Sequence, residues 1–62
     1  MNTDNVNYII TEHSNGIECD VAVFLSWEIA LRFFDAYSDD DKDALRPCIY
    51  KILPDNTRTT EY

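Results

Sequence analysis

Apolar and polar residues alternate through the first third of the chain, and this alternation predicts two strands. The segment Val6 to His13 is rich in β-branched and aromatic residues, and Ile17 to Leu25 alternates between two faces. Between them lies Asn15-Gly16, a pair that favours a type I′ turn because both positions require positive φ. We therefore expect a β-hairpin that spans residues 6–25.

The two-residue turn fixes a register that can be checked against hydrophobicity. One face would hold the pairs Ile10–Val21, Tyr8–Val23 and Val6–Leu25. The other face would hold the pairs His13–Glu18, Thr11–Asp20, Ile9–Ala22 and Asn7–Phe24. A slip of one residue would exchange the two faces of a strand, so the apolar character of the first set supports this register.

After the hairpin, apolar residues recur with helical spacing. Ser26 is a suitable N-cap, and the helix is expected from Trp27 to about Tyr37. Its apolar arc covers about 220°, although a helix lying on a sheet needs little more than about 100°. The arc's centre, near Ala30, Phe33 and Tyr37, is expected on the sheet. One edge of the arc is then left without a cover: Trp27, Leu31 and Phe34.

The remaining pattern completes a small α+β fold. Ser38 could cap a short helical turn, and Pro47 precedes a third strand, Cys48 to Leu53, with Cys48, Tyr50 and Ile52 facing the core. The order of elements is therefore β-β-α-β. A right-handed crossover through the helix makes the third strand parallel to the second, and the simplest sheet is three-stranded and antiparallel (order 2-1-3), with one helix packed on one face. Residues 1–62 are read as a single domain with an ordered core at 6–54, a ragged start at 1–5 and a loose polar tail at 55–62.

The uncovered helix edge allows three interpretations. The segment after the helix could fold back and cover it through Leu45, the edge could form a homodimer contact, or it could bind a different protein. A chain of 62 residues has a marginal core and usually needs additional stabilisation from disulfides, a metal or a second subunit. A second chain bound at this edge would provide it. Aromatic anchors dominate protein-binding sites, so Trp27, Leu31 and Phe34 are the predicted apolar contacts.

The formal charge of −7 limits the possible partners. It opposes direct binding to nucleic acid or to an anionic membrane, and suits a protein with a basic surface. The acids could form a surface that imitates nucleic-acid phosphates, or they could only keep the protein soluble. The candidates for such a surface are Glu18, Asp20, Glu28, Asp35, Asp39, Asp40, Asp41 and Asp43.

Candidate chemistry is sparse. Cys19 and Cys48 are predicted to be buried free thiols, too far apart for a disulfide, in a cytoplasmic protein. His13 is expected exposed beside the turn and without a catalytic role. The acidic run resembles the start of a calcium loop, but Ala44 and Tyr50 occupy positions that need Gly and Glu. No spacing of ligands indicates a zinc site, so neither a metal nor another cofactor is expected. No phosphate loop, nucleophile elbow or H-E-x-x-H motif is present, so an enzyme is not expected either.

The layout resembles that of small acidic inhibitors encoded by phages, such as uracil-DNA glycosylase inhibitors and many anti-CRISPR proteins. The similarity spans Tyr8 to Leu53: an Asn-Gly hairpin, an aromatic helix and a closing strand in an acidic chain. It carries over no functional residue. It implies an inhibitor from a mobile element that docks on a host protein of nucleic-acid processing or defence; the alternative is a structural homodimer subunit or adaptor.

Overall fold

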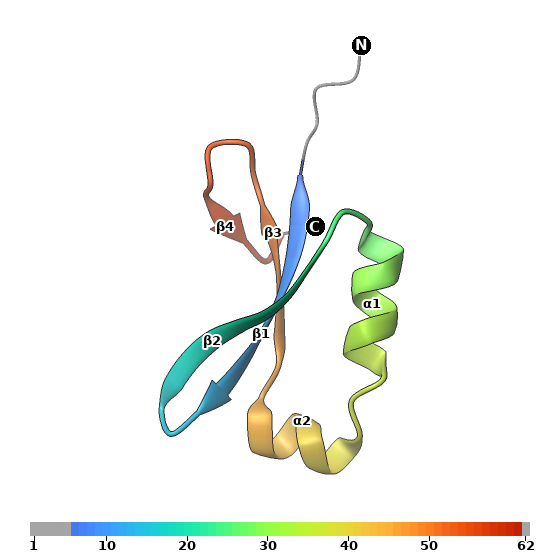
Figure 1. Ribbon diagram of the computed structural model, residues 1–62, viewed down its shortest axis with the longest axis vertical. Coiled ribbons are helices and arrows are strands. Elements are labelled where there is room, and N and C mark those ends of the chain that lie inside the picture. The colour runs from blue at the N-terminus through green and yellow to red at the C-terminus, as the bar shows by residue number, and fades with distance from the viewer. Residues whose placement is uncertain (1–5, 62) are drawn as a thin grey trace.

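One antiparallel sheet and two helices make up the part of the chain that the computed structural model describes, residues 6–61. The elements are β1 (Asn7–Ser14), β2 (Ile17–Phe24), α1 (Trp27–Asp35), α2 (Asp39–Leu45), β3 (Cys48–Ile52) and β4 (Arg58–Thr59). The strand order is β2-β1-β3-β4, and Figure 1 shows α1 beside the twisted strands with α2 at their lower end. The α+β class and the antiparallel 2-1-3 order are confirmed, whereas a fourth strand and a second helix are added. The expected ragged start lies outside the described residues.

The segment expected to be a loose tail forms a second hairpin. The Leu53 amide donates to the Thr57 carbonyl, and the Asn56 amide donates to the Leu53 carbonyl. Arg58 then pairs with Ile52 on β3, and its guanidinium makes a bidentate ion pair with the Asp20 carboxylate. The prediction of a loose tail is therefore wrong for residues 55–59, because a turn after Pro54 returns the chain to the sheet edge.

A β-bulge divides the first hairpin into two registers. From Ser14↔Ile17 to Thr11↔Asp20 the pairing is as predicted, but Ile10 then faces Ala22 rather than Val21. Val21 is the extra residue, and every later pair is shifted by one. The predicted register beyond Thr11 is therefore wrong. The shift turns Phe24 toward α1, where its ring lies 5.3 Å from that of Phe33.

Side-chain contacts identify which sheet face carries the helices. Tyr8 packs edge-on against Trp27 with ring centroids 5.6 Å apart, and Tyr37 donates a hydrogen bond to Glu12. Ile10 shares this face by strand alternation, opposite Ile49 of β3. Cys48, Tyr50 and Ile52 have the opposite parity and lie on the face away from the helices. The prediction that these three face the helix-packed core is therefore wrong, and Ile49 takes that role.

The core is small, as expected for a chain of this length. Among the described residues, the buried side chains are Ile9, Ile10, Thr11, Ala30 and Ile49. Ala30 is 0% exposed, and its small side chain lets α1 lie close to β1, β2 and β3. Phe33 was expected with Ala30 on the sheet but is 39% exposed. The helix is thus rotated from the predicted orientation, so that the edge with Ile29 and Phe33 faces solvent.

Both helices begin at the predicted caps. The Ser26 hydroxyl accepts from the Ile29 amide, and the Ser38 hydroxyl accepts from the Asp41 amide. The short helical turn suggested after Ser38 is a seven-residue helix, α2, which packs against β1. It ends at Arg46, whose left-handed backbone (φ 45°) reverses the chain into Pro47 and β3.

Candidate functional site

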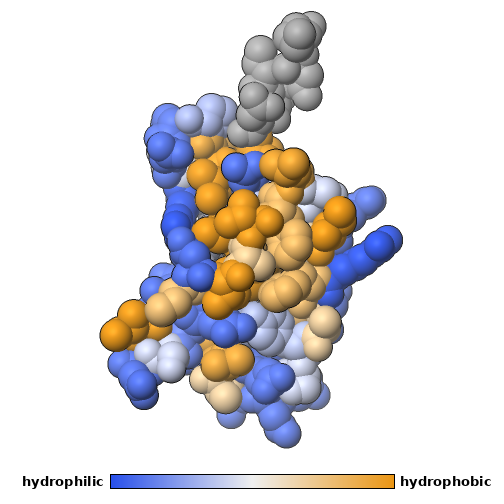
Figure 2. Space-filling model, in the orientation of Figure 1, coloured by the Kyte–Doolittle hydropathy of each residue, from blue (hydrophilic) through white to orange (hydrophobic). Residues whose placement is uncertain are grey.

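Exposed apolar side chains gather where the chain leaves β2 and enters α1. We call this set the apolar surface; it consists of Leu25, Ile29 and Phe33, which are 84, 51 and 39% exposed. The contact of Phe33 with Phe24, the residue before Leu25, joins the two segments. Val21 and Val23 are also exposed, but Val23 pairs with Ile9 and lies on the sheet face away from the helices. Figure 2 shows hydrophobic colour gathered between the strands and α1, with hydrophilic residues around it. Such a contiguous patch with a polar rim is typical of a protein-binding site.

The apolar surface lies beside an open sheet edge. β2 pairs with β1 on one side only, and it is the outermost strand of the described sheet. An edge strand presents backbone donors and acceptors that another chain can pair with. The bulge at Val21 interrupts the edge in its second half, which discourages extended pairing with a second strand. The side chains rather than the backbone therefore provide most of the exposed binding area.

Of the three predicted apolar contacts on α1, two are covered. Trp27 is half-buried against Tyr8, whereas Leu31 is 36% exposed, as predicted. Phe34 is half-buried, with the Lys42 ammonium 5.3 Å from its ring centroid. The expectation that Trp27 and Phe34 lie uncovered is therefore wrong. One interpretation was that the segment after the helix covers this edge through Leu45. That segment, α2, does cover Phe34, but the contact is made by Lys42 rather than Leu45.

The predicted acidic residues fall into two groups. Glu18 and Asp20 have internal partners: Glu18 accepts hydrogen bonds from two hydroxyls, and Asp20 pairs with Arg58 at 2.8 Å. The hydrogen bond from Thr11 lowers the pKa of Glu18, and that from Arg58 lowers the pKa of Asp20. The second group is exposed on the helices and consists of Glu28, Asp35, Asp39, Asp40, Asp41 and Asp43. Within residues 6–61, only this second group forms an exposed acidic surface without ion pairs, of the kind that was predicted.

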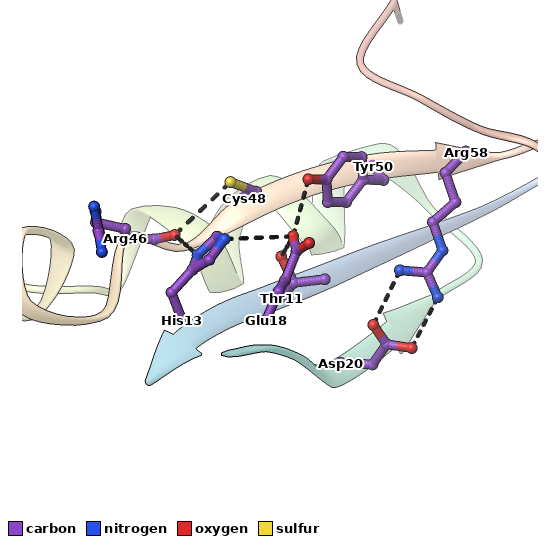
Figure 3. Close-up of polar contacts among 8 residues, drawn as sticks. All are labelled: Thr11, His13, Glu18, Asp20, Arg46, Cys48, Tyr50 and Arg58. Carbon is purple, nitrogen blue, oxygen red and sulfur yellow. Dashed lines mark hydrogen bonds and ion pairs between the residues drawn. The ribbon is translucent and has the colours of Figure 1, made fainter. Parts of the chain in front are cut away.

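A polar cluster occupies the sheet face away from the helices (Figure 3). It consists of Thr11, His13, Glu18, the Arg46 carbonyl, Cys48 and Tyr50. The Glu18 carboxylate accepts from Thr11 Oγ1 at 2.7 Å and from the Tyr50 hydroxyl at 2.9 Å. His13 Nε2 lies 3.8 Å from the same carboxylate oxygen, and its Nδ1 lies 2.9 Å from the Arg46 carbonyl. The hydrogen bond to Glu18 raises the pKa of Tyr50 to about 12.

The sequence showed part of this cluster. The cross-strand pairing of His13 with Glu18 was predicted and is confirmed. Cys48 was missed as their neighbour because it was assigned to the core side of β3 and because the strand order did not fix the register that pairs it with Thr11. Cys19 and Cys48 are both free thiols, as expected. The prediction that both are buried is wrong, since Cys19 is exposed and Cys48 is half-buried.

A shallow hollow lies between α1, α2 and β1. Its volume is about 230 Å³, and it is lined by Glu12, Phe33, Ala36, Tyr37 and Asp41. Burial and the hydrogen bond to Glu12 raise the pKa of Tyr37 to about 12. This contact ties the C-terminal end of α1 to the central strand, so it stabilises the fold while the phenol is protonated.

The tyrosine contact predicts an alkaline loss of stability. An unfolded tyrosine ionises near pH 10, and Tyr37 in the folded protein ionises near 12, so the stability it contributes is complete below pH 10. That contribution falls as pH rises from 10 to 12. In urea titrations across this range, Tyr37→Phe should flatten the decline by on the order of 1 kcal/mol. Equal declines in both proteins would show that the contact contributes nothing.

Comparison of the chain with known protein families, with curated proteins and with solved structures finds no match. Neither helix among residues 6–61 is long and apolar enough to cross a membrane.

Proposed function

We propose that this protein is a small acidic module that binds another protein through the apolar surface at the junction of β2 and α1. The observation that carries the proposal is the exposure of three large apolar side chains in one area, led by Leu25 at 84%. Covering such side chains on association removes apolar area from water, at about 25 cal/mol per Å² before the costs of association. The proposed role is that of a stoichiometric inhibitor of a host protein, or of an adaptor that binds one. Inhibition is the role of the phage-encoded proteins that the layout resembles.

Charge complementarity favours a different protein over a second copy of this chain. Glu28 and Arg32 both lie on the helix that carries Ile29 and Phe33, but the whole chain carries −7. Two such acidic copies would repel each other on association, which is unfavourable. A partner with an apolar centre and a basic rim would gain attraction instead. A basic rim is also typical of proteins that process nucleic acids, so the exposed acids of α1 and α2 would imitate phosphate charge.

A structural homodimer remains the second candidate, favoured by the open edge of β2. Sedimentation separates the two. A dimer held by the apolar surface should become tighter as salt screens the repulsion between its two chains. The proposed binding module should sediment as a monomer at both low and high ionic strength. Its expected location is the cytoplasm, where the two thiols stay reduced.

A matched pair of variants tests the proposal. Leu25→Asp places a charge in the apolar surface, whereas Ile17→Asp places the same charge on another exposed apolar residue (62% exposed), near the turn. In affinity capture from lysate of the host cell, Leu25→Asp should reduce retention of the specific partner at least about tenfold, since a central contact contributes more than 1 kcal/mol. Ile17→Asp should retain it.

Changing the four aspartates of α2 to asparagine tests the charge separately. The expected result is weaker capture at low salt and a flatter dependence on ionic strength. If capture were equally strong with Leu25→Asp, the apolar surface would not be the binding site. If it were unaffected by the four asparagines, the imitation of phosphate charge would be excluded while the apolar binding site would stand.

A further inference from the structure

We propose that His13, Glu18 and Cys48 form a site for a zinc ion on the sheet face away from the helices. One donor atom of each side chain lies within 4.8 Å of the other two. Tetrahedral zinc with ligand bonds of about 2.0 to 2.3 Å needs ligand atoms roughly 3.3 to 3.7 Å apart. The existing separation of His13 Nε2 from the Glu18 carboxylate, 3.8 Å, is already close to this value.

The imidazole is held in the orientation that a metal needs. Its Nδ1 is 2.9 Å from the Arg46 carbonyl, which can only accept, so Nδ1 carries the proton. In a neutral imidazole Nε2 is then an acceptor, and it faces a carboxylate oxygen, which is another acceptor. That oxygen already accepts from Thr11 and Tyr50, so a cation between the two side chains would give Nε2 the partner that the carboxylate cannot. Histidine ligands of metals characteristically donate their second nitrogen to a carbonyl or carboxylate in this way.

The other two ligands are also positioned by the fold. Thr11 and Tyr50 donate to Glu18 and fix its carboxylate on the same side as His13 (Figure 3). Cys48 begins β3 directly after the left-handed turn at Arg46, and its Sγ lies 3.7 Å from the same carbonyl that accepts from His13. The hairpin end and the start of β3 therefore converge on one point.

The donor set selects the metal. One thiolate, one imidazole and one carboxylate match the sulfur, nitrogen and oxygen ligands of zinc, whereas calcium and magnesium require oxygen ligands. On binding, a zinc–sulfur bond forms and the Cys48 thiol proton is released to solvent. With three protein ligands, a water molecule completes the tetrahedron. The ion would link β1, β2 and β3 at one end of the sheet. It would thereby add the stabilisation that a small core needs.

Cobalt substitution tests the site, because tetrahedral Co²⁺ with a thiolate ligand gives intense visible bands and a sulfur-to-metal charge-transfer band. We expect both bands from the intact protein at one ion per chain, with a non-thiol reductant present. We also expect Zn²⁺ at about 100 times its Kd to raise the Tm by roughly 10 to 20 °C.

The second cysteine offers a matched control. Cys19→Ser changes an exposed thiol whose strand partner is Glu12, on the other sheet face, and should keep the bands and the Tm shift. Cys48→Ser should lose the charge-transfer band, and both it and His13→Gln should weaken Co²⁺ binding more than about 100-fold. Circular dichroism and the Tm of the metal-free variants separate lost ligands from lost folding. The proposal is overturned by an absence of cobalt bands with the intact protein, by binding that survives Cys48→Ser and His13→Gln, or by two chains per ion.

Discussion

Replacing Ile10 with alanine should lower the free energy of unfolding by about 3 kcal/mol. Ile10 is 0% exposed at the centre of β1, between Ala22 and Ile49, on the face that α1 covers. The truncation removes three buried carbon atoms and leaves a cavity that a sheet held by neighbours on both sides cannot close. The total stability expected for a chain of this length is roughly 3 to 9 kcal/mol, so the variant would retain little of it.

Urea denaturation followed by the fluorescence of Trp27 measures this effect. Val23→Ala is the matched control, because Val23 is 56% exposed on the neighbouring strand and should cost less than about 1 kcal/mol. Without the bulge, Val23 would lie on the apolar face opposite Tyr8 and its truncation would also be costly. Equal losses for Ile10→Ala and Val23→Ala would therefore contradict the bulged register.

Enlarging Ala30 to leucine should destabilise the protein by about 2 kcal/mol. Ala30 is 0% exposed where α1 lies on the sheet, so three further carbon atoms would push the helix away from the strands. The loss arises although leucine and alanine are both good helix formers. The Tm should fall by roughly 8 to 16 °C.

The same substitution at an exposed alanine provides the control. Ala36 ends α1 beside the hollow, and Ala36→Leu should change the free energy of unfolding by less than about 0.5 kcal/mol. A neutral Ala30→Leu would mean that α1 does not contact the sheet through Ala30. It would contradict the orientation that the sequence suggested as well, since that orientation also placed Ala30 on the sheet.

The sequence predicted the positions of the helices and strands better than it predicted which face of each one packs on the core. Asn15-Gly16, Ser26 and Pro47 are local signals, and the hairpin, α1 and β3 begin close to where they indicate. The bulge at Val21 has no such signal, because the residues Asp20 to Val23 fit an unbroken strand equally well. It brings Phe24 into contact with Phe33, a tertiary contact that the local pattern does not show. One extra residue was enough to exchange the predicted faces of half a strand.

The candidate sites differ in how far local pattern could reveal them. Excess apolar residues on α1 were visible in the sequence, but the exposed edge proved to be Ile29 and Phe33, because the rotation of a helix on a sheet depends on side-chain packing. The polar cluster joins residues 13, 18 and 48, whose spacing has no metal-binding signature. Cys48 reaches His13 only through the pairing of β3 with β1.

Hydrogen exchange of the complex with the captured partner tests the central claim, that the apolar surface is the binding site. Binding there should slow exchange in the segment that carries the apolar surface, residues 25–33, and leave the first hairpin turn at 14–17 unchanged. Protection confined to the turn or to α2, with residues 25–33 exchanging as in the free protein, would contradict it.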